Sequence, residues 1–180
     1  GGLALGGEGR VVDWLVEMVR LPATSMLDLR LKAGPVPRLS EIVSLSDLLV
    51  SFYRKQHRTA DMGHRFYHRL MRDSRTNAAH LREMRHHMGS ALREEVLDFA
   101  LPALESCRGE IIARACQGLL SEGHGDLRPE HVCLTDPPVV FDRVEFDHDV
   151  RLADPFFEFN ELGIECASAG AAWIRAVMLF

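Results

Sequence analysis

The chain has 180 residues, which is enough for one folded domain with its own core and short for two. Apolar residues make up 47% and charged residues 26%, and this balance excludes an intrinsically disordered chain. The net charge of −5 argues against a general nucleic-acid binder, and no run of 18 apolar residues predicts a membrane span. We therefore expect a soluble globular protein that binds neither nucleic acid nor membrane.

The net charge hides a strong asymmetry along the chain. Residues 54–93 carry ten Arg and Lys against three Asp and Glu, whereas residues 121–165 carry three Arg against twelve Asp and Glu. Such an acidic segment suits a divalent cation or a cationic substrate. It equally suits a solvated surface that faces the basic segment. Both interpretations stay open at this point.

Cysteine spacing and the first residues of the chain give an expectation for the cellular compartment. The four cysteines, at positions 107, 116, 133 and 166, form no C-x-x-C pair. This favours reduced thiols over a disulfide framework or a thiolate zinc site. The first residues lack the basic-then-apolar layout of a signal peptide, so we expect a cytoplasmic protein.

The first residues predict a strand pair. Leu-Ala-Leu at 3–5 and the apolar run from Arg10 to Met18 flank a turn of sequence GGEG. Glycines supply the positive φ angles that a tight hairpin requires. A phosphate-binding glycine loop is the alternative, but no G-x-G-x-x-G spacing fits and no lysine follows closely.

Helical spacing of apolar residues dominates from residue 40 onward. It predicts helices over 40–58, 61–89, 90–106 and 108–120, the first with Ser40 as N-cap and Glu41 in its first turn. The stretch VCLTDPPVVFDRVEF (132–146) has two apolar runs around Asp-Pro-Pro and predicts a small hairpin. A last helix is expected to begin near Asp154-Pro155. The fold class is therefore α+β, mostly helical, with the strands segregated from the helices.

One polar stretch, GHGDLRPEH (123–131), stands between the helices and the hairpin. Asp126 lies five residues before His131 and sixteen before Asp142, which ends the strand Val139–Phe141. Phosphoryl transfer needs one carboxylate for the acceptor hydroxyl and one or two side chains that hold Mg²⁺ against the phosphates. A hairpin that folds these residues together would deliver that set. The alternative is a capped turn whose Asp and His satisfy backbone groups.

HGDLRPEH followed by VVFDRVEF resembles the aminoglycoside phosphotransferase family, which has a protein-kinase-like fold. The family pattern is His-Gly-Asp-x-x-x-x-Asn, then an apolar strand ending in Asp, with a further Asp about a dozen residues on. The resemblance implies that Asp126 is the catalytic base or hydroxyl-orienting residue and that His124 buttresses the loop. It implies Mg²⁺ ligation by Asp142 with His131, which replaces the pattern's asparagine. Asp154 and Arg128 would support the loop.

The same resemblance gives expectations for the rest of the chain. Residues 1–20 would be the last strands of an amino-terminal lobe, with Glu17, Met18 and Val19 as the hinge that meets the adenine of ATP. Residues 21–180 would be the helical carboxy-terminal lobe, with its catalytic loop at 124–131 and its metal-binding strand end at 139–142. The glycine-rich loop and ATP-contacting lysine of the family have no counterpart here. We therefore expect a fragment that lacks most of its amino-terminal lobe and is inactive alone. The resemblance implies that the complete protein phosphorylates a hydroxyl group of a small molecule, cationic ones included.

Two other classes of function compete with this one. A metal-dependent hydrolase would use His124, Asp126, His131 and His148 as ligands for a metal that activates water. A non-catalytic nucleotide-binding domain would keep the fold, with His131 as a sign of decay. His64 and His68 also share the spacing of two zinc ligands, but no third ligand is identifiable and a solvated helix face is expected there.

Overall fold

The computed structural model describes residues 4–6, 8, 10–56, 62–83 and 89–179. In these residues the chain is mostly helical, with short antiparallel strand pairs, as the sequence predicts. None of the described helices combines the length and the apolar character needed to cross a bilayer. The elements in order are η1 (Ala23–Ser25), α1 (Leu27–Ala33), α2 (Leu39–Lys55), α3 (Met62–Glu83), α4 (Ser90–Ser106), α5 (Arg108–Cys116), β1 (Ser121–Glu122), η2 (Pro129–His131), β2 (Val132–Cys133), β3 (Val139–Val140), α6 (His148–Arg151), β4 (Leu152–Ala153), α7 (Pro155–Ser168) and α8 (Ala172–Leu179).

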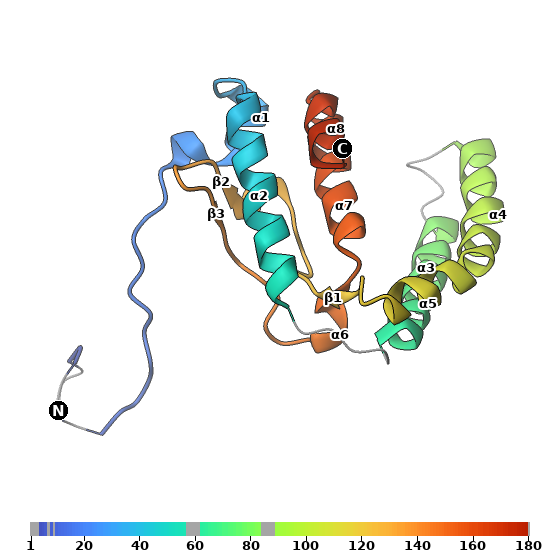
Figure 1. Cartoon of the computed structure of the whole chain (residues 1–180), viewed down its shortest axis with the longest axis horizontal. Helices are drawn as coiled ribbons and strands as arrows, with labels where there is room; N and C mark the ends of the chain where they lie inside the picture. The colour runs from blue at the N-terminus through green and yellow to red at the C-terminus, as the bar shows by residue number, and fades with distance from the viewer. Residues whose placement is uncertain (1–3, 7, 9, 57–61, 84–88, 180) are drawn as a thin grey trace.

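The larger hydrophobic core joins α1, α2, α7 and α8, which lie side by side in Figure 1. Ile42, Leu45 and Leu49 recur at helical spacing on α2 and are fully or almost fully buried. Leu162 and Ile174 meet them from α7 and α8, so each helix buries one apolar stripe against the others. Leu127 and Val132 belong to the same core, which ties the polar loop and the hairpin to this half of the molecule.

A second, smaller core joins α3 and α5. Met62 and Phe66 of α3 pack there with Ala115 of α5, and Leu120 and Leu152 close the cluster. In Figure 1 α3, α4 and α5 form a separate group of helices opposite α7 and α8. Helix α5 ends at Cys116, earlier than the predicted residue 120, because Gly118 adopts a φ of 70° that ends the helical hydrogen bonding.

Two strand pairs frame the polar loop between these cores. Strand β1 pairs with β4 through Ser121↔Ala153 and Glu122↔Leu152. Strand β2 pairs with β3 through Val132↔Val140 and Cys133↔Val139, which confirms the predicted hairpin around Asp-Pro-Pro. The loop at 123–131 therefore enters from one pair and leaves into the other, so both of its ends are fixed.

The predicted amino-terminal strand pair is wrong for the described residues. Residues 10–22 form an extended segment without strand pairing, and it runs away from the helices in Figure 1. Its apolar side chains face solvent, with Trp14 83% exposed. The residues have strand-forming side chains, but a strand exists only where a partner satisfies its backbone groups, and no described segment does so. Residues 3, 7 and 9 of the predicted hairpin lie outside the described part.

Helix α2 begins one residue before Ser40, and its N-cap is Arg38 instead. The Glu41 carboxylate accepts the Arg38 backbone N–H at 2.7 Å and also accepts two hydrogen bonds from the buried Arg30 guanidinium, each at 3.0 Å. Hydrogen bonding by Arg30 lowers the pKa of Glu41 from 4.5 to about 2. This carboxylate thus joins α1 to α2 in its charged form.

We predict that Glu41→Gln lowers the free energy of unfolding by about 1–3 kcal/mol at neutral pH, because Arg30 loses a charged acceptor. The folded-state pKa of Glu41 is depressed, so its contribution is present above pH 4.5 and is lost as pH falls towards 2. Urea denaturation across this pH range should show that the free energies of unfolding of wild type and Glu41→Gln converge at acid pH. Glu94→Gln is the control, since the Glu94 carboxylate is 63% exposed and lies 3.6 Å from Arg93. A difference in the free energy of unfolding between wild type and Glu41→Gln that is the same at every pH would contradict the prediction.

Candidate functional site

The loop at 123–131 has a backbone that two glycines make possible. At Gly123 a Cβ atom would lie 2.5 Å from Oε2 of Glu158, so a side chain there would displace the Glu158 carboxylate. Gly125 has a φ of 89°, a conformation that residues with side chains rarely adopt. These two positions let the chain turn sharply over the first turn of α7 and present Asp126 on the outer side.

A buried carboxylate holds this loop from below. Glu158 of α7 is 3% exposed, and it accepts the backbone N–H groups of His124 at 2.9 Å and Gly125 at 2.6 Å. The Tyr53 hydroxyl donates a third hydrogen bond to it from the end of α2. Burial and the neighbouring Glu158 charge raise the pKa of Tyr53 well above its ordinary value, so the hydroxyl keeps its proton and remains a donor. Three donors thus satisfy one buried charge.

Neither Glu158 nor Tyr53 was predicted as a site residue from the sequence. The available signal was the position of Glu158 in the stretch FFEFNELGI, where a charged residue is surrounded by apolar ones. A carboxylate at such a position must be paired when the helix is buried. Its partners are backbone groups 33 and 34 residues earlier in the chain, and they have no signature in sequence.

His124 acts as a brace inside the loop. It is 4% exposed, and its Nε2 lies 2.8 Å from the carbonyl oxygen of Phe141 while its Nδ1 accepts the backbone N–H of Asp126 at 3.3 Å. A carbonyl only accepts, so Nε2 carries the proton and Nδ1 the lone pair. Both ring nitrogens are therefore occupied, and the imidazole connects the loop to the end of β3.

His131 lies between Asp126 and Asp142. Its Nδ1 donates to the backbone carbonyl of Asp126 at 2.7 Å, and its Nε2 lies 3.5 Å from Oδ2 of Asp142. The ring stacks on His124 with centroids 5.7 Å apart, which fixes its orientation. The Asp126 side chain is 48% exposed and that of Asp142 is 74% exposed, and the backbone of Asp142 has a φ of 63°. The three side chains are thus brought together, and both carboxylates remain open to a ligand.

Asp142 and His131 are the two side chains of this cluster that could contribute ligands to a divalent cation. Because Nδ1 of His131 is the donor, the lone pair of the neutral ring is on Nε2, next to the Asp142 carboxylate. Among the described residues no group of three His, Cys, Asp or Glu side chains is arranged to hold a metal ion by itself. Mg²⁺ commonly binds through one or two carboxylates together with substrate phosphates, and this pattern suits a two-ligand site.

The other predicted site residues have different surroundings. Asp154 caps α7 by accepting the Phe156 N–H at 3.0 Å, and it pairs with Arg114 of α5, so it joins α7 to α5. The carboxylate from α7 that accepts the backbone N–H groups of the loop is that of Glu158. Arg128 pairs with Glu165 of α7 at 3.1 Å, which ties the loop to α7 at the surface.

The predicted hinge residues Glu17, Met18 and Val19 all lie in the exposed extended segment before η1. In the described part of the chain no side-chain hydrogen bond joins them to the loop. Their expected contact with adenine stays a prediction.

The ligand set expected for a metal-dependent hydrolase does not assemble. His124 has both ring nitrogens engaged within the loop. His148 pairs instead with Glu122 of β1, with its Nε2 2.6 Å from Oε1. Asp126 and His131 are therefore not joined by the two further histidines of the expected ligand set.

A groove of about 920 Å³ opens beside the loop, between the two helical groups. Its walls come mainly from α3, α5 and the first turns of α7, with single residues from α4 and α8, and Gly125 also lines it. Half of its sixteen lining residues are polar, and its volume lies within the range of small-molecule sites. The polar residues lining it are Arg69, Asp73, Ser74, Asn77, Arg114, Asp154, Asn160 and Glu161.

Comparison of the chain with protein-family models, with curated proteins and with solved structures finds no match in any of the three. The interpretation of the site therefore depends on its geometry and on the motif itself.

We predict that Glu158→Gln lowers the free energy of unfolding by about 1–3 kcal/mol, because an amide NH₂ would face backbone donors. Amide hydrogen exchange at His124 and Gly125 should accelerate as well. Glu165→Gln is the control, since the Glu165 carboxylate forms only an exposed pair with Arg128 and its loss should cost less than about 0.5 kcal/mol. Unchanged exchange at His124 and Gly125 in Glu158→Gln would show that this carboxylate does not hold the loop.

Proposed function

We propose that the chain carries the catalytic loop of an ATP-dependent phosphotransferase that acts on a hydroxyl group of a small molecule. The observation that carries the proposal is the placement of Asp126 and Asp142 on either side of His131, with both carboxylates open to solvent. When bound, ATP and Mg²⁺ would supply the phosphoryl group and the positive charge that offsets its phosphates. The protein would hold the acceptor and the metal ion in position through its charged side chains.

Asp126 is suited to orient the acceptor hydroxyl. Its backbone is fixed through the His124 brace, and its neighbours His124 and Gly125 are held by Glu158, while its side chain projects outward. A carboxylate in this position accepts the hydrogen bond of the alcohol and takes up the proton as the phosphoryl transfers. A merely structural turn would use the carboxylate of Asp126 to satisfy backbone groups, whereas here Glu158 and His124 perform that task.

Asp142 and His131 are suited to hold the metal. The positive φ of Asp142 projects its carboxylate away from β3, towards Nε2 of His131. An imidazole binds Mg²⁺ less readily than an asparagine oxygen does, so this site would hold the ion weakly and would depend on the phosphates. A non-catalytic nucleotide-binding domain is the second candidate. It is favoured by the presence of His131 where the family pattern has an asparagine.

The groove beside Gly125 is the proposed acceptor site. It has room for a small molecule, and Asp73 and Glu161 on its walls would favour an acceptor that carries an amine. Arg69 and Arg114 are less available to an acceptor, because Arg69 donates to the carbonyls of Val150 and Leu152 and Arg114 pairs with Asp154.

We predict that Asp126→Asn lowers ATP-dependent phosphorylation of hydroxyl-bearing amines by about 10²–10⁴-fold, the usual contribution of a positioned base. The assay measures ADP release by the natural full-length protein with a panel of amino alcohols and amino sugars. Glu145→Gln is the control, because this exposed carboxylate lies three residues beyond Asp142 and outside the cluster. Turnover by Asp126→Asn equal to that of wild type would refute the mechanism. ATP binding without turnover in the wild type would favour the non-catalytic candidate.

Metal binding gives a second and independent prediction. Asp142→Asn and His131→Ala should each weaken Mn²⁺ binding in the presence of ATP by about tenfold or more, as measured by water-proton relaxation. His131→Asn should instead strengthen Mg²⁺ binding, since an amide oxygen is the harder ligand. Equal affinities in wild type, Asp142→Asn and His131→Ala would show that this pair does not hold the ion.

A further inference from the structure

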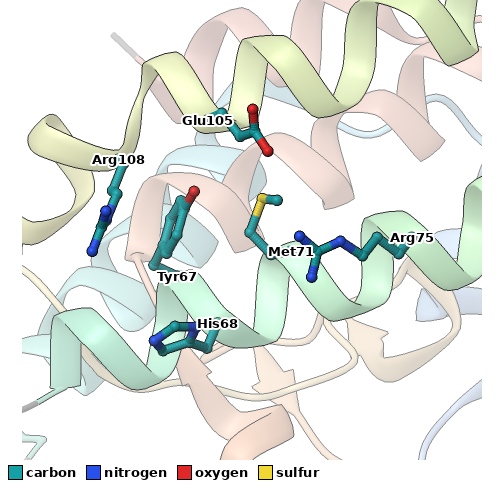
Figure 2. Close-up of a pocket in the computed structure, with 6 residues that line it drawn as sticks. All are labelled: Tyr67, His68, Met71, Arg75, Glu105 and Arg108. Atoms are coloured by element: carbon teal, nitrogen blue, oxygen red, sulfur yellow. The ribbon is translucent and has the colours of Figure 1, made fainter.

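A second cavity, of about 490 Å³, lies on α3 against the junction of α4 and α5. It shares no lining residue with the loop at 123–131 or with the groove beside it. Figure 2 shows its six lining side chains, which come from α3 and from both sides of the α4–α5 junction. They are Tyr67, His68, Met71, Arg75, Glu105 and Arg108.

The cavity has an apolar floor and a charged rim. Tyr67, Met71 and Arg75 follow one another at intervals of four residues, so they lie along one stripe of α3. Tyr67 and Met71 are buried at 8% and 5% exposure, whereas Arg75, Glu105 and Arg108 are exposed. An aromatic ring and a thioether therefore form the base of the cavity, and ionised groups surround its opening.

Two arginines at this rim have unused hydrogen-bonding capacity. Neither Arg75 nor Arg108 forms a salt bridge or a side-chain hydrogen bond with another described residue, whereas Arg30 and Arg114 each form a bidentate pair. The Arg108 guanidinium lies over the Tyr67 ring, 5.6 Å from its centroid. This cation–π contact holds the group in place and leaves its N–H groups free at the edge.

We infer that this cavity binds a small organic oxyanion, with a phosphate or carboxylate group on an arginine of the rim and an apolar body on Tyr67 and Met71. The planar N–H fork of a guanidinium group matches the oxygen pair of such an anion. Glu105 at the same rim repels a second negative charge, so a compact anion with a single charged group is preferred. The cavity volume lies within the range of small-molecule sites. This inference does not depend on phosphotransferase activity.

The test uses phenyl phosphate, benzoate, inorganic phosphate and tyramine as probes of the full chain. Calorimetry measures affinity, and NMR follows the Tyr67 ring and the Met71 methyl group. Phenyl phosphate or benzoate should bind with a Kd of about 1 mM or below and shift both signals. The stronger of the two identifies the anionic group. Inorganic phosphate should bind at least about tenfold more weakly because it covers no apolar floor, and tyramine should not bind.

The double variant Arg75→Gln/Arg108→Gln should weaken binding of the better probe by at least about tenfold. The control, Arg72→Gln/Arg82→Gln, removes the same charge from exposed positions of α3 outside the cavity and should change the Kd by less than about twofold. Both variants change exposed side chains, and circular dichroism checks that they are folded. Failure of every probe to bind the wild type would overturn the inference. An equal loss of affinity in both double variants would also overturn the inference, because that result would show a general effect of charge.

Discussion

The buried carboxylate of Glu158 is the constraint on which the site depends. A charge removed from water must be compensated by donors, and here two donors are the backbone amides of His124 and Gly125. The third donor, Tyr53, comes from the end of α2. The Glu158 carboxylate therefore joins the loop to α2 and to its own helix, α7, which both belong to the larger core. The absence of a side chain at Gly123 lets the loop approach the carboxylate this closely.

This arrangement separates the residues that hold the loop from the exposed carboxylates that we propose take part in the reaction. His124 and Glu158 satisfy the loop from inside and are almost fully buried. Asp126 and Asp142 are left exposed, and His131, stacked on His124, lies between them. Preorganisation of this kind is what a phosphotransferase requires of its protein, because the reaction depends on positioning and electrostatics. The ion pair of Arg114 and Asp154 then sets α5 against the start of α7, beside the groove proposed for the acceptor.

Much of the fold was predictable because the signals are local. Apolar spacing predicted α2, the Asp-Pro-Pro turn predicted the β2–β3 hairpin, and Asp154-Pro155 predicted the start of α7. The amino-terminal strand pair was predicted wrongly because apolar, β-branched residues are necessary for a strand but its pairing is a tertiary event. The end of α5 was displaced for a local reason, since Gly118 with its positive φ ends the helix before the predicted residue.

The sequence by itself determined helices α2, α3, α4 and α7, the hairpin and the spacing that connects Asp126, His131 and Asp142, because periodicity, turn residues and motif distances are properties of neighbouring positions. Only the tertiary structure decided what each histidine does. Of the three histidines near the loop, His124 is fully engaged with the backbone, His148 pairs with Glu122, and His131 keeps a ring nitrogen facing an exposed carboxylate. It likewise decided that Glu158 supports the loop, since its partners lie more than thirty residues away. Hydrogen bonds between distant segments depend on how the chain packs, and packing leaves no local pattern to detect.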